Sequence, residues 1–453
     1  MELAPLANRY HGWVWAALPA GCRRVRVVGD PGLAELLRAA GINVGGEGPG
    51  PCTTLVAFGR PPSAAELEAV EHVGPGDTVA LAWPGNGRDR ARVIGRLRQA
   101  GLETHTLAVA PRHRRGLDRP RSVLARRPRR RCHTVVMGAS APARWLLQEA
   151  LARAARAVDM ELTQRAVTVL STGTVLAELA SLSGERFALR IAGGPAAGLL
   201  ERSGSNVAAV LAADPPDPVG ERLPVPLAAG CVHPAIWTLE EWISGDRPGR
   251  LSPALWSECL EFLVGLHRTG AADATRIVHP WSLESDFRAL ERFADERARR
   301  TLARLQAELE RRLADVPRGW AHGDFWPANL LVEGRNLVAV LDWDSATPGT
   351  PALLDVMHLL LLSDRRARRL PHGSRSLRVL LPLAQDGGDA RMRRYCAATA
   401  TPSGASTLEG LALAYWVSRV GRDLRTFENR PRRRAWMEAN LHQPVGELAR
   451  RGW

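Results

Sequence analysis

Short apolar runs alternate with amphipathic stretches over the first quarter of the chain. The runs at 25–28, 53–58, 78–83 and 104–109 are apolar or β-branched and predict strands. Between them, the spacing of apolar residues predicts helices at 32–40, 63–72 and 88–100. Strands that alternate with helices favour a parallel sheet covered by helices. We therefore predict an α/β Rossmann-like domain over residues 1–135.

The turn after the first strand indicates whether this domain binds a nucleotide-like ligand. A dinucleotide or S-adenosylmethionine loop needs several glycines so that backbone N–H groups can approach the ligand. Only Gly29 and Gly32 occur here, and Pro31 removes one N–H. The order of the elements resembles a small-molecule methyltransferase domain that has lost its binding loop. A structural or scaffolding role stays open beside it.

The pattern changes after residue 135. A helical pattern at 143–157 predicts a linker and connecting helix over residues 136–160. From residue 162 strands come first, and helices follow to the end. This order predicts an α+β body with a sheet-rich lobe at 161–245 and a helical lobe at 246–453.

Polar residues with the spacing of a catalytic and metal site follow in the helical lobe. Asp324 comes after His322 and Gly323, and Asn329 lies five positions further on. The apolar runs 330–332 and 337–341 are separated by Glu-Gly-Arg-Asn, which predicts a β-hairpin. The hairpin brings Asp342 back beside Asn329. Carboxylate and amide oxygens suit Mg²⁺, and Asp324 is left to orient a hydroxyl and accept its proton.

These residues also carry a family resemblance. The His-Gly-Asp at 322–324, the Asn at 329 and the Leu-Asp-Trp-Asp at 341–344 resemble the motifs of the aminoglycoside phosphotransferase and choline kinase family. The resemblance extends from about residue 162 to the C-terminus. It implies a bilobal protein-kinase-like fold and an enzyme that transfers phosphate from ATP, with Mg²⁺, to a hydroxyl of a small molecule.

The resemblance also implies roles for single residues. Asp324 resembles the catalytic base, and His322 the residue that supports the catalytic loop. Asn329 and Asp342 resemble the magnesium ligands. Asp355 matches an acidic residue that braces the catalytic loop from behind.

The sheet-rich lobe departs from the family pattern where it should hold ATP. The third strand, 187–191, carries Arg190 in place of the lysine that pairs with the phosphates. The next helix offers Glu201 or Asn206 as its partner. The turn between the first two strands is either an ordinary hairpin turn or a phosphate-binding loop; its residues are Ser171, Thr172, Gly173 and Thr174.

The segment 237–245 resembles the family's hinge strand between the lobes. The resemblance implies that the backbone at Glu241 and Ile243 binds the adenine edge. An edge strand with two buried tryptophans explains the same sequence, and the two interpretations are compatible.

Composition changes this picture little. The chain has 453 residues and a net charge of +14, and all 61 basic residues are Arg. The absence of Lys indicates a coding bias rather than a nucleic-acid partner. The densest cluster, 112–131, contains no aromatic residue to stack on bases, and it is typical of a solvated linker.

The sequence lacks the motifs that are typical of several other classes of protein. No apolar run approaches the ~18 residues that cross a bilayer, and we expect a cytoplasmic protein without a membrane partner. The six cysteines form no CxxC pair, and neither HExxH nor GxSxG occurs. The oligomeric state is not predicted.

Two further expectations concern function. The alternative is a pseudokinase that binds a nucleotide or metabolite and regulates the N-terminal domain. It is suggested by Arg190, which replaces a lysine, and by the turn at 171–174, which is poor in glycine. The Arg-rich stretches 364–394 and 422–451 disfavour a polycationic acceptor. A neutral or anionic, sugar-like metabolite is expected, with aminoglycosides as the contrasting class.

Overall fold

The computed structural model describes residues 12–28, 31–45, 52–57, 62, 67, 77–84, 89–111, 133–139, 143–170, 172–269, 282–426 and 434–453. Its contacts divide the chain into two compact units. The first unit holds residues 1–201 and 225–242, and the second holds 202–224 and 243–453. Each is described by itself.

The first unit is built on one eleven-stranded sheet in the order β10-β11-β9-β8-β7-β5-β6-β4-β3-β1-β2. Its strands are β1 (Arg24–Val28), β2 (Asn43–Val44), β3 (Thr53–Ala57), β4 (Thr78–Pro84), β5 (Glu103–Pro111), β6 (His133–Ala139), β7 (Leu162–Val169), β8 (Val175–Ser181), β9 (Arg186–Gly193), β10 (Pro226–Val232) and β11 (Ala235–Glu241). Its helices are α2 (Val14–Ala17), α3 (Pro31–Ala39), α5 (Arg90–Gln99), α6 (Leu146–Ala157) and the start of α7 (Pro195–Ala212).

The N-terminal part of this sheet confirms the four predicted strands and two of the three predicted helices. Strands β2, β1, β3 and β4 are parallel neighbours, whereas β6 lies antiparallel between β4 and β5. The helix expected at 63–72 and the basic cluster at 112–131 fall outside the described residues, apart from Leu67. The Rossmann-like classification of residues 1–135 stays a prediction.

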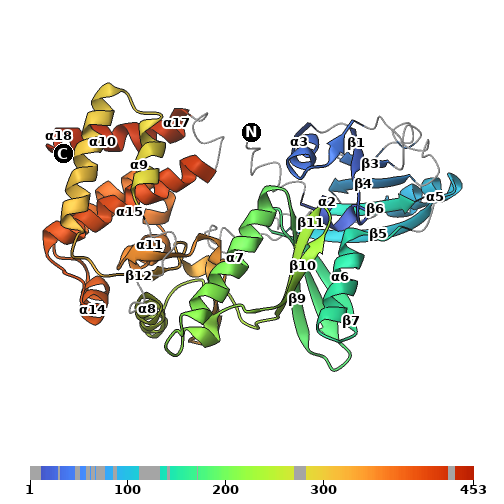
Figure 1. Cartoon of the computed structure of the whole chain (residues 1–453), viewed down its shortest axis with the longest axis horizontal. Helices are drawn as coiled ribbons and strands as arrows, with labels where there is room; N and C mark the ends of the chain where they lie inside the picture. Colours follow the sequence, from blue (N-terminus) through green and yellow to red (C-terminus); the bar gives the residue numbers. More distant parts are fainter. Residues whose placement is uncertain are drawn as a thin grey trace, which may run out of the picture. The chain divides into compact units, whose positions relative to one another are not determined.

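The sheet continues from the N-terminal part into β7–β11. Strand β5 pairs in parallel with β7 through Ala110 and Thr168 and through Pro111 and Val169. The segment expected as linker and helix holds the end of β6 and all of α6, and α6 packs against β9, β10 and β11 (Figure 1). The domain boundaries drawn from the sequence therefore stay a prediction.

A short N-terminal helix contributes a large part of the core of the first unit. Trp13 and Trp15 are fully buried at α2. A Cβ on Gly193, the last residue of β9, would lie 2.7 Å from the Trp15 ring. Only glycine allows this close approach, so the indole is fixed against the end of the strand.

The second unit is mainly helical. Its helices are the rest of α7, α8 (Pro253–Arg268), α9 (Glu284–Glu291), α10 (Glu296–Arg312), α11 (Leu354–Ser363), α12 (His372–Arg375), α13 (Leu381–Gln385), α14 (Ala390–Ala398), α15 (Ala405–Thr426), α17 (Arg434–Met437) and α18 (Gln443–Arg450). Two strand pairs join them: β12 (Arg318–Ala321) with β15 (Thr347–Pro351), and β13 (Leu330–Glu333) with β14 (Asn336–Val340).

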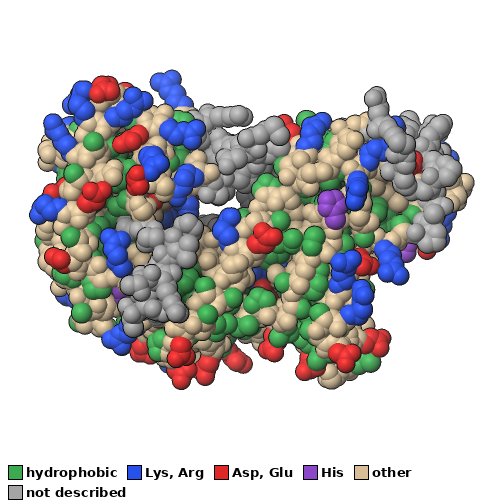
Figure 2. Space-filling model, in the orientation of Figure 1, with side chains coloured by type: hydrophobic (Ala, Val, Ile, Leu, Met, Phe, Trp, Pro, Cys, Tyr) green, Lys and Arg blue, Asp and Glu red, His purple; other side chains and the backbone are tan. Residues whose placement is uncertain are grey.

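Local sequence explains where the helices of the second unit begin. Ser252 caps α8 by accepting the N–H of Leu255, with Pro253 at the first position, and Asp295 caps α10 in the same way. One face of α10 buries Leu302, Leu305 and Leu309. Its other face mixes basic and acidic side chains, as the space-filling view shows (Figure 2). Among the described residues, no helix combines the length and the apolar character of a membrane span.

Candidate active site

The predicted catalytic loop follows strand β12 in the second unit. Gly323 has a φ of +73°, and a Cβ there would lie 2.3 Å from the carbonyl oxygen of Ser345. Both the conformation and the close approach require glycine. The loop that carries Asp324 is thus held directly against the loop that follows Asp342.

His322 supports this loop from the interior. Its ring is fully buried, and its Nδ1 accepts the N–H of Asp324 at 3.2 Å. Its Nε2 lies 3.1 Å from the carbonyl oxygen of Leu341, to which it donates. Burial lowers the pKa of His322 to about 4, so the ring is neutral and can hold both bonds at once. His322 therefore links the catalytic loop to the end of β14.

Asp355, at the start of α11, binds the same loop from behind. Its two carboxylate oxygens accept the N–H groups of His322, at 2.6 Å, and of Gly323, at 2.9 Å. Burial raises the pKa of Asp355 to about 6, although the two N–H groups oppose that shift. The contact is the one that the sequence predicted for this residue.

The carboxylate of Asp324 is surrounded by donors. Its Oδ1 lies 3.0 Å from Arg419 Nη2 and 3.2 Å from His358 Nε2. Its Oδ2 accepts from Trp326 Nε1 at 3.1 Å and from Asn329 Nδ2 at 3.2 Å. Burial opposes ionisation, but the contact with His358 and the charge of Arg419 outweigh it and hold the pKa of Asp324 well below its usual range. Asp324 is therefore ionised at neutral pH.

The β-hairpin places Asn329 and Asp342 at the same end. Leu330 pairs with Val340, and the N–H of Leu341 donates to the carbonyl oxygen of Asn329 at 2.8 Å. Asp342 follows with a φ of 73°, a left-handed conformation that is uncommon outside glycine. The predicted hairpin is confirmed. The role of the two residues as metal ligands stays a prediction.

Two further contacts stabilise the segment around Asp342. The indole N–H of Trp343 donates to the carbonyl oxygen of Val340 at 2.8 Å. The amide of Asn206 on α7 donates to the carbonyl oxygens of Trp343, at 2.8 Å, and Ala346, at 3.1 Å. Asn206 therefore braces this segment, whereas the sequence offered it as a partner of Arg190.

The turn between β7 and β8 lies in the first unit. Leu170 N–H donates to the carbonyl oxygen of Thr174 at 2.8 Å, and Gly173 has a φ of 88°. The hydroxyls of Thr172 and Thr174 lie 3.0 Å apart in a hydrogen bond. Ser171 lies outside the described residues. The segment forms a tight hairpin turn, and phosphate contact stays a prediction.

Arg190 lies on β9 and forms an ion pair within the sheet. Its Nη2 is 3.0 Å from Oε2 of Glu240 on the neighbouring strand β11. The other expected partner, Glu201, is exposed. Burial raises the pKa of Glu240, and the positive charge of Arg190 opposes that rise. The Nε of Arg190 is buried without a partner among the described residues.

The predicted hinge follows directly after this ion pair. Glu241 is the last residue of β11 and pairs with Phe187 of β9. The N–H of Trp242 then donates to the carbonyl oxygen of Arg186 at 2.9 Å, and Ile243 follows outside any helix or strand. Adenine binding at Glu241 and Ile243 stays a prediction.

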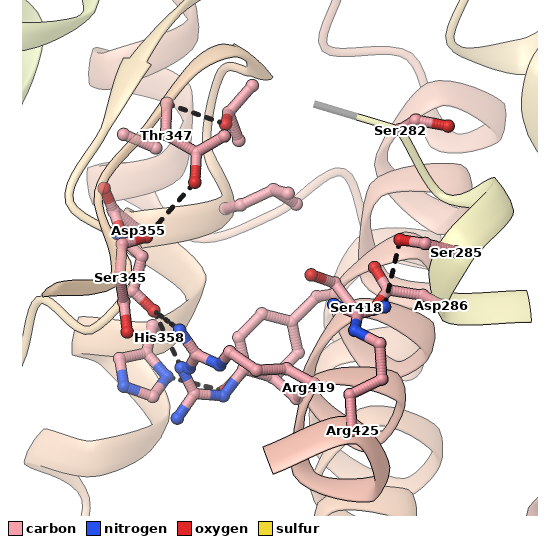
Figure 3. A pocket seen from close by; sticks show the side chains of 16 residues that line it. Ser282, Ser285, Asp286, Ser345, Thr347, Asp355, His358, Ser418, Arg419 and Arg425 are labelled. Atoms are coloured by element: carbon pink, nitrogen blue, oxygen red, sulfur yellow. Dashed lines mark hydrogen bonds and ion pairs between the residues drawn. The ribbon is translucent and has the colours of Figure 1, made fainter. Parts of the chain in front are cut away.

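A cavity of about 290 Å³ opens beside the catalytic loop. Figure 3 shows Thr347, Asp355 and His358 on one side, and Asp286 and Arg425 on the other. The full lining is Ser282, Ser285, Asp286, Ala321, Gly323, Ser345, Thr347, Thr350, Leu354, Asp355, His358, Tyr415, Ser418, Arg419, Arg422 and Arg425. Its position next to Asp324 makes it the candidate acceptor site.

The sequence did not single out the cavity residues that lie close to Asp324. His358 is buried, and its Nδ1 lies 2.8 Å from the hydroxyl of Tyr415. Arg419 and Arg422 both donate to the carbonyl oxygen of Gly323, at 2.8 and 3.0 Å. Arginines spaced three apart on α15 would have been a usable signal, because they share one helix face.

Asp344 is the last residue of the motif at 341–344, but the sequence predicted no role for it. Burial raises its pKa to about 6, and the nearby charge of Asp324 adds to the rise. It is therefore a further carboxylate close to Asp324.

The chain was compared with known proteins. Residues 179–375 match the model of a phosphotransferase enzyme family. The match includes Asp324, Asn329 and Asp342 but ends before α15. No curated protein matches the chain.

Solved structures show limited similarity. A macrolide 2′-phosphotransferase from Brachybacterium faecium is 20% identical, with 65% of this chain and 96% of that one covered and a TM-score of 0.40. A putative fructosamine-3-kinase from Thermobifida fusca is 14% identical (66% and 98% covered, TM-score 0.44). A thermostable mutant of an aminoglycoside phosphotransferase is 15% identical (64% and 94% covered, TM-score 0.39).

Proposed function

We propose that the chain, of which residues 179–375 match the model of a phosphotransferase enzyme family, transfers the γ-phosphate of ATP, in the presence of Mg²⁺, to a hydroxyl of a small molecule. The observation that carries the proposal is the geometry around the hairpin. Asn329 binds the carboxylate of Asp324 through its amide nitrogen. Its amide oxygen is thereby oriented away, at the end of the hairpin that leads into Asp342.

The donor set fits a hard cation. Asn329 and Asp342 would hold Mg²⁺ through oxygen atoms, the ligands that this ion prefers. When bound, the ion neutralises negative charge on the phosphates of ATP. The left-handed conformation of Asp342 supports this role, because such backbone conformations in non-glycine residues cluster at functional sites.

The chain's own residues account for the rest of the reaction. Asp324 orients the acceptor hydroxyl and takes its proton as the oxygen attacks the γ-phosphorus. His322 and Asp355 fix the backbone on both sides of Asp324. Arg190 fits a phosphate contact, since its buried Nε has no partner among the described residues.

A second candidate is a nucleotide- or metabolite-binding module without turnover, a pseudokinase that regulates or scaffolds the N-terminal part. Two observations favour it. Three hydrogen bonds already engage the carboxylate of Asp324, and His358 Nε2 lies 3.2 Å from it. The partner of Arg190 is a residue of a neighbouring strand rather than of a helix.

One assay separates the two candidates. The full chain is incubated with ATP, Mg²⁺ and a panel of sugars, aminoglycosides, amino alcohols and hydroxy acids, and ADP formation is measured. We expect Asp324→Asn to reduce turnover by about 10²- to 10⁴-fold, the usual contribution of a general base. The exposed Asp315→Asn is the matched control. ATP binding without turnover on any acceptor would favour the pseudokinase.

A further inference from the structure

The carboxylate of Asp324 is crowded on both of its oxygens. Its Oδ2 accepts from Trp326 and Asn329, and its Oδ1 accepts from Arg419 and lies 3.2 Å from His358 Nε2. Arg422 adds an ion pair to Oδ1 at 3.7 Å. A base must hydrogen-bond to the hydroxyl that it deprotonates, so the arginine side chains at Oδ1 have to move aside before the acceptor hydroxyl can bind there.

Two of the donors are tied to the protein elsewhere. His358 also contacts the hydroxyl of Tyr415, and Asn329 also donates to the carbonyl oxygen of Asp324 at 3.0 Å. Arg419 and Arg422 also donate to the carbonyl oxygen of Gly323, but they reach Asp324 from α15 with long side chains that line the cavity. Rotation of these side chains moves the charge without moving the backbone. They are the donors that can leave.

The cavity is the place where these arginines can bind another anion instead of Asp324. Arg419, Arg422 and Arg425 follow one face of α15, and Arg425 also has a close acidic partner in Asp286. Within the part of the chain that the structure describes, the buried Nε of Arg419 has no hydrogen-bond partner. Figure 3 shows Arg419 reaching into the pocket, with hydroxyl-bearing Ser345 and Thr347 opposite Ser285. Guanidinium groups form bidentate hydrogen bonds with carboxylates and phosphates.

We propose that this cavity binds an acceptor with a carboxylate or phosphate group, and that this anion draws Arg419 and Arg422 away from Asp324. The proposal rests on the proposed phosphotransferase function. The freed Oδ1 of Asp324 then accepts the proton of the acceptor hydroxyl. The oxygen forms a bond to the γ-phosphorus, the bond from that phosphorus to the β-phosphate oxygen breaks, and ADP leaves. The anion is thus both the recognised group and the group that exposes the base.

The size of the cavity limits the acceptor. Its volume of about 290 Å³ is small. A small hydroxy acid or a phosphorylated triol fits this size. A polycation meets three arginines on one wall, and like charges disfavour it.

A series of acceptors of one shape tests the proposal. Glycerol, D-glycerate, glycerol 3-phosphate and 3-amino-1,2-propanediol share a hydroxylated three-carbon chain and differ in one terminal group. With the full chain, ATP and Mg²⁺, we expect kcat/KM for one of the anions to exceed that for glycerol and for the amine by roughly 100-fold, the effect of charge-assisted hydrogen bonds. Equal or faster reaction with the neutral or cationic member would overturn the proposal.

Binding without ATP separates this proposal from the proposed function. Titration calorimetry of D-glycerate and glycerol 3-phosphate should show a roughly 10- to 100-fold loss of affinity in Arg422→Gln. The control Arg394→Gln, an exposed arginine on α14, should bind as the wild type does. Melting temperatures of both variants check the fold.

The outcomes are distinct. Anion binding that depends on Arg422, with no turnover of any acceptor, would refute the kinase but keep the anion site. Turnover that prefers glycerol would keep the kinase and refute the anion site. No binding of either anion, or affinity that is unchanged in Arg422→Gln, would also overturn the anion site.

Discussion

The loop around Asp324 in the second unit and the strand around Arg190 in the first hold their charged groups by different means. Asp355 on α11 fixes the loop from outside, and His322 and Asn329 fix it from within, all through buried hydrogen bonds. Arg190 is held by one ion pair to the adjacent strand, and one of its nitrogens has no partner among the described residues. The group that we propose to accept the proton is thus held by several contacts, whereas the group that we propose to bind phosphate keeps an unused donor.

The largest effect should come from breaking the loop network at Asp355. In Asp355→Asn one of the two N–H acceptors becomes an NH₂ group that faces the N–H of His322 or Gly323. We expect a loss of about 2–4 kcal/mol in the free energy of unfolding, since each buried hydrogen bond to a charged group is worth about 1.5–3 kcal/mol.

Denaturant unfolding of Asp355→Asn measures this loss. Asp386→Asn, at an exposed position, is the control. A loss in Asp355→Asn no larger than in the control would show that the loop is not held in this way.

A buried histidine in the last turn of α8, His267, allows a test by pH. Burial, and then the charge of Arg268, lower the pKa of His267 to about 4 from 6.5. The unfolded chain binds this proton between pH 6.5 and 4 and the folded chain does not, so stability is complete above pH 6.5 and falls as the pH drops towards 4. At 1.36 kcal/mol per pKa unit the contribution is up to about 3 kcal/mol.

Unfolding curves between pH 4 and 7 measure the contribution of His267. His267→Gln should flatten the pH dependence, and the exposed His442→Gln should leave it unchanged. An equal slope in wild type and His267→Gln would contradict the assignment.

In the first unit, Arg190→Gln tests the proposed contact with the phosphates of ATP. We expect the KM for ATP to rise by roughly 10- to 100-fold, as for a lost charge-assisted hydrogen bond. Because the single change leaves Glu240 buried without its partner, the double variant Arg190→Gln/Glu240→Gln separates stability from binding. Arg165→Gln, exposed on β7, is the control. An unchanged KM would refute the phosphate contact.

The smallest effect is expected at Asn206. Asn206→Ala removes two hydrogen bonds to the carbonyl oxygens of Trp343 and Ala346. At about 1 kcal/mol for each hydrogen bond, thermal or denaturant unfolding should show a loss of roughly 1–2 kcal/mol. Asn43→Ala, exposed on β2, is the control. If the fall in kcat, expressed as a free energy, exceeds the loss of stability, these hydrogen bonds also contribute to catalysis.

Much of the site could be predicted because its residues are close in sequence. A two-residue turn at Gly334 suffices to bring β14 back along β13, so the neighbourhood of Asn329 and Leu341 follows from local pattern. Asp355 lies in the same stretch and makes the predicted contact. Arg419 lies 95 residues from Asp324, and no local pattern connects the two.

The sequence by itself determined the elements of this protein. The spacing of apolar residues and the turn residues decide which segments become strands and helices, because these depend on neighbours along the chain. The tertiary structure decided the partners: Glu240 for Arg190, the Trp343 segment for Asn206, and α15 for Asp324. Partners of this kind depend on the packing of elements that are distant in sequence. The local spacing of apolar residues does not specify that packing.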